Sequence, residues 1–340
     1  MNQRMQKVPR RNRLQLALAL AALVAGSAAT GASPGLPDGP PLTPDSLTPS
    51  SGAWFGAHVH KRTEKTEYDA VLALEREVGR KFAIDNHYEH WVDPTFKEEP
   101  LDLAAGRIPL VSWPSGSWPN GIDATAILSG SQDARIKFAA DGLKALGKQV
   151  LLRFAYEMDH GPGSGRYIGP PSVFIPAWRH VHDLFVSEGA TNVKWVWCAV
   201  SHNFANGTAQ TYYPGDAYVD WIAADGFSFW PVQQTTKGTW RSLQEIYTDF
   251  YAWGATKAKP LMIASTGVQE DPGRPSRKAQ WFQDATTTLK TWPRLKALVY
   301  YNATITGING KAYFYADSSP TSLTAYTKMG ADPYLNPPVP

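Results

Sequence analysis

Residues 151–159 read Leu-Leu-Arg-Phe-Ala-Tyr-Glu-Met-Asp, an apolar run that carries one arginine and leads into two carboxylates. Side chains alternate between the two faces of a β-strand, so every second residue of this run faces the same way. The side chains expected on the inner face are Leu151, Arg153, Ala155 and Glu157. Charges on such a face are costly unless they are paired or functional. A buried ion pair between Arg153 and Glu157 is therefore the structural alternative to a functional role for Glu157.

Seven further apolar runs recur along the chain, with helix-like stretches between them. Near-continuous apolar strands that alternate with amphipathic helices predict a parallel sheet covered by helices. Eight such units predict an α/β protein with a (β/α)8 barrel. A doubly wound open sheet is the alternative, but no Gly-rich phosphate loop follows any of the runs. The expected strands are residues 54–58, 81–88, 108–114, 149–159, 193–202, 219–228, 260–267 and 295–302.

The stretches between these runs have the apolar spacing of surface helices. In one of them Ile136, Ala139 and Leu143 recur along one helical face, and Gly147 follows as a helix-ending residue. In a barrel of this kind, the last inward residue of each strand projects into the mouth of the active site. The barrel prediction thus makes Glu157 a candidate catalytic acid. The expected helices are residues 67–78, 132–146, 173–188, 242–253 and 276–289.

The N-terminal 32 residues predict a secretory signal peptide. A positively charged region precedes an apolar core at residues 14–24, and small residues with plausible cleavage sites follow. This core is short for a membrane span, so an uncleaved anchor is the less favoured alternative. We therefore expect a secreted, extracellular protein with no membrane attachment after cleavage.

Removing this segment changes the charge balance. It contains five of the 33 basic residues and none of the 30 acidic ones, which leaves 28 basic residues against 30. No basic patch indicates a nucleic-acid partner. Residues 33–52 are rich in Pro, Ser, Thr and Gly and predict a linker, residues 53–330 predict the barrel, and residues 331–340 a short tail. The single cysteine, Cys198, excludes an internal disulfide. We expect a monomer.

Polar and aromatic side chains gather at the predicted C-terminal ends of the strands, where a barrel carries its site. The chain has 13 tryptophans in 340 residues. Aromatic faces stack on sugar rings, while carboxylates and amides bind sugar hydroxyls, so this set favours an oligosaccharide or polysaccharide as the partner. Most of the tryptophans are expected to pack in the core. The side chains expected to contact substrate are His58, Trp91, Trp113, Arg153, Asp159, Trp197, Asn203, Trp230 and Tyr301.

Two other kinds of site are weakly supported. The histidines are irregularly spaced and match neither His-Glu-x-x-His nor a clustered ligand pattern, so we expect no metal and no other cofactor. A Ser-His-Asp hydrolase is disfavoured because no Gly-x-Ser-x-Gly elbow is present. A glycosidase needs a second carboxylate as partner to Glu157.

Several segments together resemble glycoside hydrolase family 26, which comprises β-mannanases and mixed-linkage β-glucanases. Their order spans nearly the whole chain after the linker. The resemblance implies a (β/α)8 barrel and a retaining mechanism with two glutamates, and it assigns the acid/base role to Glu157. The matching stretches are residues 153–159, 177–179, 192–197, 213–216, 219–221, 225–226, 259–264 and 278–281.

The departures from the family pattern fall at the site. Ser265 stands where the family has its nucleophile glutamate. Phe227, which we also expect to contact substrate, replaces the tyrosine whose hydroxyl supports that nucleophile. Tyr156 replaces the histidine before the acid/base residue. Serine has no carboxylate with which to attack the anomeric carbon, and no activating base is evident beside it. The resemblance therefore predicts the scaffold more firmly than the standard reaction.

Three functions stay open. The first is an endo-acting glycoside hydrolase of altered chemistry, acting on β-mannan or β-glucan by resemblance, with Asp225 as the leading second carboxylate and Glu270 or Asp271 as alternatives. The second is a non-catalytic polysaccharide-binding protein on the same barrel. The third is a transglycosylase, or a hydrolase that uses a neighbouring group of its substrate.

Overall fold

The computed structural model describes residues 40–42, 47–117, 120–229, 240–307 and 310–340. The predicted signal peptide, most of the predicted linker and Trp230 lie outside these ranges. In the described ranges, no helix combines the length and the apolar character needed to cross a membrane.

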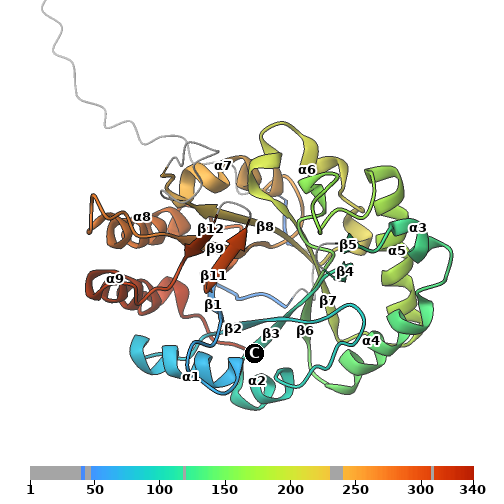
Figure 1. Ribbon diagram of the computed structural model, residues 1–340, viewed down its shortest axis with the longest axis horizontal. Coiled ribbons are helices and arrows are strands. Elements are labelled where there is room, and N and C mark those ends of the chain that lie inside the picture. The colour runs from blue at the N-terminus through green and yellow to red at the C-terminus, as the bar shows by residue number, and fades with distance from the viewer. Residues whose placement is uncertain (1–39, 43–46, 118–119, 230–239, 308–309) are drawn as a thin grey trace, which may run out of the picture. The chain divides into compact units, whose positions relative to one another are not determined.

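Eight parallel strands close into a barrel with the order β1-β10-β9-β8-β7-β6-β3-β2 (Figure 1). The predicted (β/α)8 barrel is confirmed, and the open doubly wound sheet is wrong. Strands of this type are buried on both faces, which explains their near-continuous apolar sequences. The barrel strands are β1 (Trp54–Val59), β2 (Ile84–Tyr88), β3 (Ile108–Trp113), β6 (Val150–Phe154), β7 (Val193–Val200), β8 (Trp221–Ser228), β9 (Leu261–Val268) and β10 (Leu295–Asn302).

The helices lie outside the barrel and surround it (Figure 1). All five helices expected from the sequence are present, with ends that differ by at most two residues. Shorter helices and two small hairpins, which periodicity does not reveal, complete the connections. The helices are α1 (Glu67–Val78), α2 (Glu99–Ala105), α3 (Ala124–Leu128), α4 (Asp133–Ala145), α5 (Pro171–Ser187), α6 (Thr208–Thr211), α7 (Leu243–Gly254), α8 (Arg277–Lys290) and α9 (Pro320–Gly330); the hairpins are β4 (Gly116–Ser117) with β5 (Asn120–Gly121) and β11 (Thr304–Gly307) with β12 (Gly310–Tyr313).

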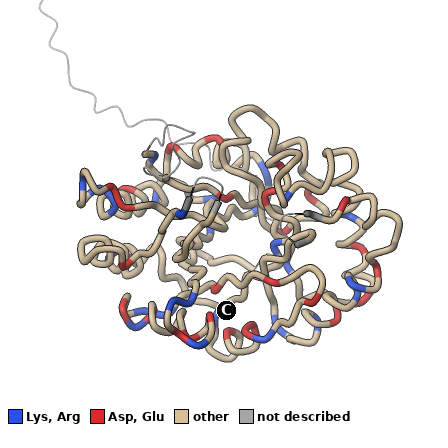
Figure 2. Tube along the Cα trace, viewed as in Figure 1, with Lys and Arg blue, Asp and Glu red and all other residues tan. Residues whose placement is uncertain are grey.

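Strand alternation separates two apolar layers. Leu151 belongs to the cluster inside the barrel, where Trp54 and Trp221 stack with ring centroids 6.3 Å apart. Its neighbour Leu152 belongs to the outer cluster between the strands and the helices. Charged residues lie mostly along the peripheral helices and loops (Figure 2). A charge inside the barrel therefore needs a specific explanation.

The described parts of the linker and the tail pack against the barrel. Leu47 is buried within the inner cluster. The amide of Ala53 donates to the carbonyl of Tyr334 at 2.9 Å, and Trp54 Nε1 donates to the carbonyl of Pro338 at 3.2 Å. These contacts join the chain on both sides of the barrel domain.

The pairing of β1 with β2 depends on a glycine. Gly56 lies opposite Ile84, and a Cβ at position 56 lies 2.6 Å from the Ile84 carbonyl oxygen. We predict that Gly56→Ala lowers the free energy of unfolding by about 1–3 kcal/mol because strand backbone, not a flexible side chain, must move. Urea denaturation measures this. Gly273→Ala is the matched control, since its added Cβ has ordinary contact at 3.4 Å. Equal losses in the two variants contradict the prediction.

Candidate active site

A cavity of about 330 Å³ opens between the C-terminal halves of the barrel strands. Its wall combines residues of β2, β8, β9 and β10 with the loop after β6 and with strand β11. Both carboxylates proposed from the sequence, Glu157 and Asp225, lie in this wall. The lining residues are Tyr88, Tyr156, Glu157, Arg166, Asp225, Phe227, Ser265, Tyr301, Thr304, Ile305 and Thr306.

Glu157 reaches the cavity by a route that strand alternation does not predict. Strand β6 ends at Phe154, and the backbone then turns with φ of +44° at Ala155 and +58° at Glu157. The expected inward position of Ala155 is wrong, because the turn places it in the outer cluster. Tyr156 and Glu157 face the cavity instead. Left-handed conformations of non-glycine residues are costly, so the surrounding structure must impose this turn. The Glu157 amide donates to the Cys198 carbonyl at 2.9 Å.

Two basic side chains flank the Glu157 carboxylate. His160 Nε2 lies 3.6 Å and Arg166 Nε 3.7 Å from its Oε2 atom. Burial raises the pKa of Glu157, but the contact with His160 and the charge of Arg166 outweigh burial and hold the net pKa below the ordinary glutamate value. Glu157 is thus ionised at neutral pH in the free protein.

Arg153 lies inside the barrel and is fully buried. Its Nη1 donates to both Asp225 carboxylate oxygens at 2.8 Å, and its Nε donates to Ser112 Oγ at 2.9 Å. Its Nη2 donates to the Tyr88 hydroxyl at 3.1 Å. The expected contact of Arg153 with substrate is wrong, because it lies beneath the cavity and is not part of its wall. The alternative pair of Arg153 with Glu157 is wrong too, because Asp225 is the partner.

Asp225 is a buried carboxylate that still borders the cavity. Burial raises its pKa, Arg153 opposes this, and the charge of Glu157 raises it further, to about 6. The Cys198 thiol also donates to its Oδ1 at 3.2 Å. The two cavity carboxylates therefore have pKa values displaced in opposite directions, a common feature of acid–base pairs.

Ser265 lies beside Asp225, with which it pairs across β8 and β9. Its carbonyl accepts from the Tyr247 hydroxyl at 3.2 Å. Among the described residues, no carboxylate bonds to its side-chain hydroxyl. The alternatives Glu270 and Asp271 do not line the cavity: Glu270 accepts from the hydroxyls of Ser318 and Ser319, and Asp271 from Arg277 Nη1.

Aromatic rings form one side of the cavity. Phe227 and Tyr301 meet edge to face with centroids 5.7 Å apart, and both border the open space. His58 stacks on Tyr301 at 5.2 Å from the layer below, where its Nδ1 donates to the Asn86 carbonyl. Burial lowers the pKa of His58 to about 3, so the ring is neutral. His58 therefore supports the wall and does not line it.

Three of the predicted tryptophans do not reach the cavity. Trp91, Trp113 and Trp197 are buried in the outer cluster. Trp113 stacks on Trp91 at 4.5 Å, and Trp197 donates from Nε1 to the Tyr212 carbonyl. The expected sugar contacts of these residues are wrong, because Trp113 and Trp197 occupy the outward parity of their strands. Position near a strand end does not determine which face of the strand a side chain occupies, whereas its parity along the strand does.

Asp159 and Asn203 bind each other. Asn203 Nδ2 donates to Asp159 Oδ2 at 3.0 Å, and the Val200 amide donates to Asp159 Oδ1 at 3.0 Å. Both residues are buried and neither borders the cavity. Their expected contact with substrate is therefore replaced by a link between the loop after β6 and the end of β7.

Sequence reasoning missed several wall residues. Arg166 comes from a Gly-rich loop with no periodicity, and its guanidinium lies 4.2 Å from the Tyr156 ring. Residues 304–306 belong to β11, which follows the last barrel strand directly. Tyr88 ends β2 with its side chain on the inward face, so strand alternation could have identified it as a wall residue. Within the described ranges, two groups have ligand atoms close enough to hold a metal ion: His58, His60 and Glu67, and Asp85, His87 and Asp102.

No family model matches this chain. Endoglucanase H of Acetivibrio thermocellus is 31% identical over 285 residues, which are 81% of this chain and 29% of the relative. β-1,3-Xylanases of a Vibrio and an Alcaligenes species are 28% and 26% identical over 178 residues, which are 49% of this chain and 36% and 35% of the relatives. The chain thus spans about a third of the length of these relatives.

Solved structures match over most of the chain. A family 26 β-mannanase from Bacteroides ovatus superposes with a TM-score of 0.60 at 16% identity, covering 84% of this chain and 90% of that one. A modular endo-β-1,4-mannanase from Cellulomonas fimi gives 0.61 at 17% identity, covering 83% and 71%. A β-mannanase from a protist symbiont of the termite Reticulitermes speratus, complexed with a gluco-manno-oligosaccharide, gives 0.57 at 18% identity, covering 88% and 99%. The chain therefore has the (β/α)8 barrel fold of family 26 glycoside hydrolases, as its motifs predict.

The buried pair of Arg153 and Asp225 gives a stability prediction. Arg153→Met leaves the Asp225 carboxylate buried without its cation, so we expect a loss of about 3–5 kcal/mol in the free energy of unfolding. Urea denaturation at pH 7.5 measures it. The double variant Arg153→Met/Asp225→Leu removes both charges and should recover most of the loss. A single variant that loses less than about 1 kcal/mol contradicts a tight buried pair.

Proposed function

We propose that this protein is a secreted, monomeric member of glycoside hydrolase family 26 that cleaves internal bonds of a β-mannan or β-glucan. One observation carries the proposal: Glu157 and Asp225 share one cavity at the mouth of a family 26 barrel. The endoglucanase and mannanase names of its relatives support the substrate class and the endo-acting mode. The signal-like N-terminal 32 residues support secretion.

The proposed reaction uses the two carboxyl groups in different roles. Glu157, in its protonated form, donates a proton to the glycosidic oxygen as the bond from that oxygen to the anomeric carbon breaks. Asp225, as a carboxylate, accepts a proton from a water molecule while the water oxygen bonds to the anomeric carbon. Such a displacement inverts the anomeric configuration.

Ser265 supports this division of roles. Its side chain is shorter than glutamate, and it lies beside Asp225 at the family's nucleophile position. A covalent glycosyl intermediate needs a carboxylate there. A shorter residue leaves room for a water molecule next to the proposed base. Phe227 and Tyr301 would stack on the sugar ring, and Arg166 would donate to its hydroxyls.

A second candidate function is a non-catalytic polysaccharide-binding protein. Ser265 favours it, because the family's nucleophile carboxylate is missing. The lowered pKa of Glu157 favours it as well, since a proton donor is more effective with a raised pKa. The cavity and its aromatic wall would then persist for binding alone.

Mutagenesis separates the two candidates. We predict that the wild-type protein releases reducing ends from a β-mannan or β-glucan, and that Glu157→Gln and Asp225→Asn each lower kcat/KM by about 10²–10⁴-fold. Glu270→Gln is the matched control and should keep wild-type activity, because Glu270 is bonded to Ser318 and Ser319 outside the cavity. A reducing-sugar assay over a glycan panel measures this.

The non-catalytic candidate predicts a different outcome. Wild-type protein that binds oligosaccharides in calorimetry but cleaves none of the panel contradicts hydrolysis. If activity then appears only in Ser265→Glu, the wild-type protein is a non-catalytic polysaccharide-binding protein on a glycosidase barrel.

The two pKa values predict an acidic pH optimum. Below the lowered pKa of Glu157 both groups are protonated, and above about pH 6 both are ionised. Between these limits the pair holds one proton, mainly on Asp225, and the reactive form with the proton on Glu157 and the charge on Asp225 is a minor form that is most populated in this range. We therefore expect kcat/KM to be bell-shaped, with its alkaline limb near pH 6. His160→Gln removes a cation beside Glu157, so the acidic limb should move to higher pH. Constant activity from pH 6 to 9 contradicts the assignment of both groups.

A further inference from the structure

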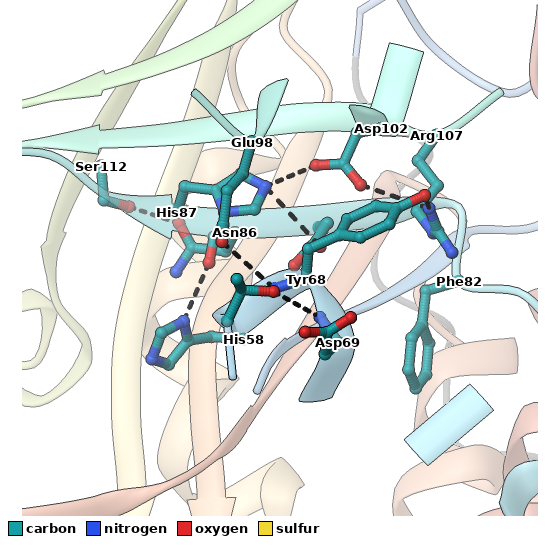
Figure 3. Close-up of polar contacts among 12 residues, drawn as sticks. His58, Tyr68, Asp69, Phe82, Asn86, His87, Glu98, Asp102, Arg107 and Ser112 are labelled. Atoms are coloured by element: carbon teal, nitrogen blue, oxygen red, sulfur yellow. Dashed lines mark hydrogen bonds and ion pairs between the residues drawn. The ribbon is translucent and has the colours of Figure 1, made fainter. Parts of the chain in front are cut away.

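A buried group of ionisable side chains lies on the other face of β2, away from the cavity. Along this strand Asn86 faces inward and its carbonyl accepts from His58, whereas Asp85 and His87 face α2. We call this group the β2 carboxylate cluster. Its members are Asp85, His87, Glu98, Glu99 and Asp102. Figure 3 shows the His87 ring between Glu98 and Asp102, with Arg107 on the far side of Asp102.

His87 is the centre of the cluster. Its Nδ1 lies 3.3 Å from Glu98 Oε2. Its Nε2 lies 3.6 Å from Asp85 Oδ2 and is in contact with Asp102 Oδ2. One nitrogen and two carboxylate oxygens, from three residues, thus lie within 4.8 Å of one another.

The hydrogen bonds of the cluster are incomplete. Asp85 is 1% exposed, and its Oδ2 has no hydrogen-bond partner within the described part of the chain. Both carboxylate oxygens of the fully buried Glu99 are in the same condition. A buried carboxylate oxygen without a partner is costly, and buried charges are normally paired or bind a metal. The Asp85 Oδ2 atom lies 3.6 Å from His87 Nε2, the same nitrogen that contacts Asp102 Oδ2, so all three groups converge on one point.

We propose that Asp85 Oδ2, His87 Nε2 and Asp102 Oδ2 bind a divalent transition-metal ion such as Zn²⁺. Imidazole with two carboxylates suits these ions, whereas Mg²⁺ and Ca²⁺ prefer oxygen ligands alone. In metal sites, the side chains that bind the ion are oriented by further polar contacts. Here Glu98 accepts the Nδ1 proton of His87, which leaves Nε2 to bind the ion. Arg107 Nη1 lies 3.3 Å from Asp102 Oδ1 and so orients the Asp102 carboxylate. Binding displaces one proton from His87 to solvent.

The position of the site gives it a structural role. Asp85 and His87 belong to β2, and Asp102 belongs to α2, so the ion joins the helix to the barrel. Tyr88, which borders the cavity, directly follows His87. Burial lowers the pKa of His87, but the carboxylates of Asp85 and Asp102 outweigh it and raise the pKa well above its ordinary value. The competing arrangement is therefore a metal-free imidazolium paired with the same carboxylates.

Asp85→Asn separates these arrangements. Because Asp85 Oδ2 has no hydrogen-bond partner in the described structure, the substitution removes a metal ligand while breaking no hydrogen bond of that atom. Chelator-treated wild-type protein is titrated with ZnCl₂ at pH 7.5, and bound zinc and the melting temperature are measured. We expect one equivalent of zinc and a rise in Tm on the order of 5 °C at a hundredfold excess over Kd.

The variants decide the outcome. Asp85→Asn and His87→Gln should lose both the bound equivalent and the zinc-dependent rise in Tm. His180→Gln should keep both, because it alters a matched His–Asp pair, with Asp133 at 2.7 Å, elsewhere on the surface. The proposal is overturned if wild-type protein binds no zinc, or if Asp85→Asn binds and responds as wild type does. Circular dichroism verifies the fold of each variant before titration.

Discussion

The buried ion pair of Arg153 and Asp225 is the constraint on which the candidate site depends. It joins β6 to β8 inside the barrel, where charges are otherwise rare, and its remaining donors reach Ser112 on β3 and Tyr88 on β2. A guanidinium in this position is tolerated only because its donors are used, since an unpaired buried charge costs several kcal/mol. The pair therefore determines the position of Asp225 in the cavity wall. The Arg153 guanidinium also packs against the Tyr156 ring, 4.4 Å from its centroid. Because the Arg153 guanidinium is bonded to Asp225, Ser112 and Tyr88, the Glu157 carboxylate pairs instead with His160 and Arg166.

The barrel was predictable from the sequence because parallel strands buried on both faces leave long apolar runs, and surface helices leave a clear periodicity. Strand alternation also placed Arg153 inside the barrel correctly. The same rule failed at Ala155, two residues later, because positive φ angles at Ala155 and Glu157 end the strand; Ala155 joins the outer cluster, while Glu157 still borders the cavity. Local sequence contains no signal for such a turn at alanine or glutamate. Tertiary structure imposes it.

The partners in the site were less predictable than its residues. Position near a strand end identified Glu157, Asp225 and Tyr301, and the family resemblance identified Phe227; all four border the cavity. Strand-end position also selected Trp113 and Trp197, whose parity points them toward the helices. Arg166 and the β11 residues 304–306 could not be predicted, because loops and short hairpins have no sequence period that shows where a side chain points. The β2 carboxylate cluster joins residues up to 17 positions apart along the chain, so no ligand spacing revealed it.

The proposed hydrolysis uses Glu157 and Asp225, with no carboxylate at position 265. The most direct test is the anomeric configuration of the first product, followed by proton NMR during cleavage of a β-linked oligosaccharide. Water activated by Asp225 predicts that the α-anomer appears first, with configuration inverted. Initial formation of the β-anomer would show a retaining mechanism with a covalent or neighbouring-group intermediate, and would contradict the role assigned to Asp225.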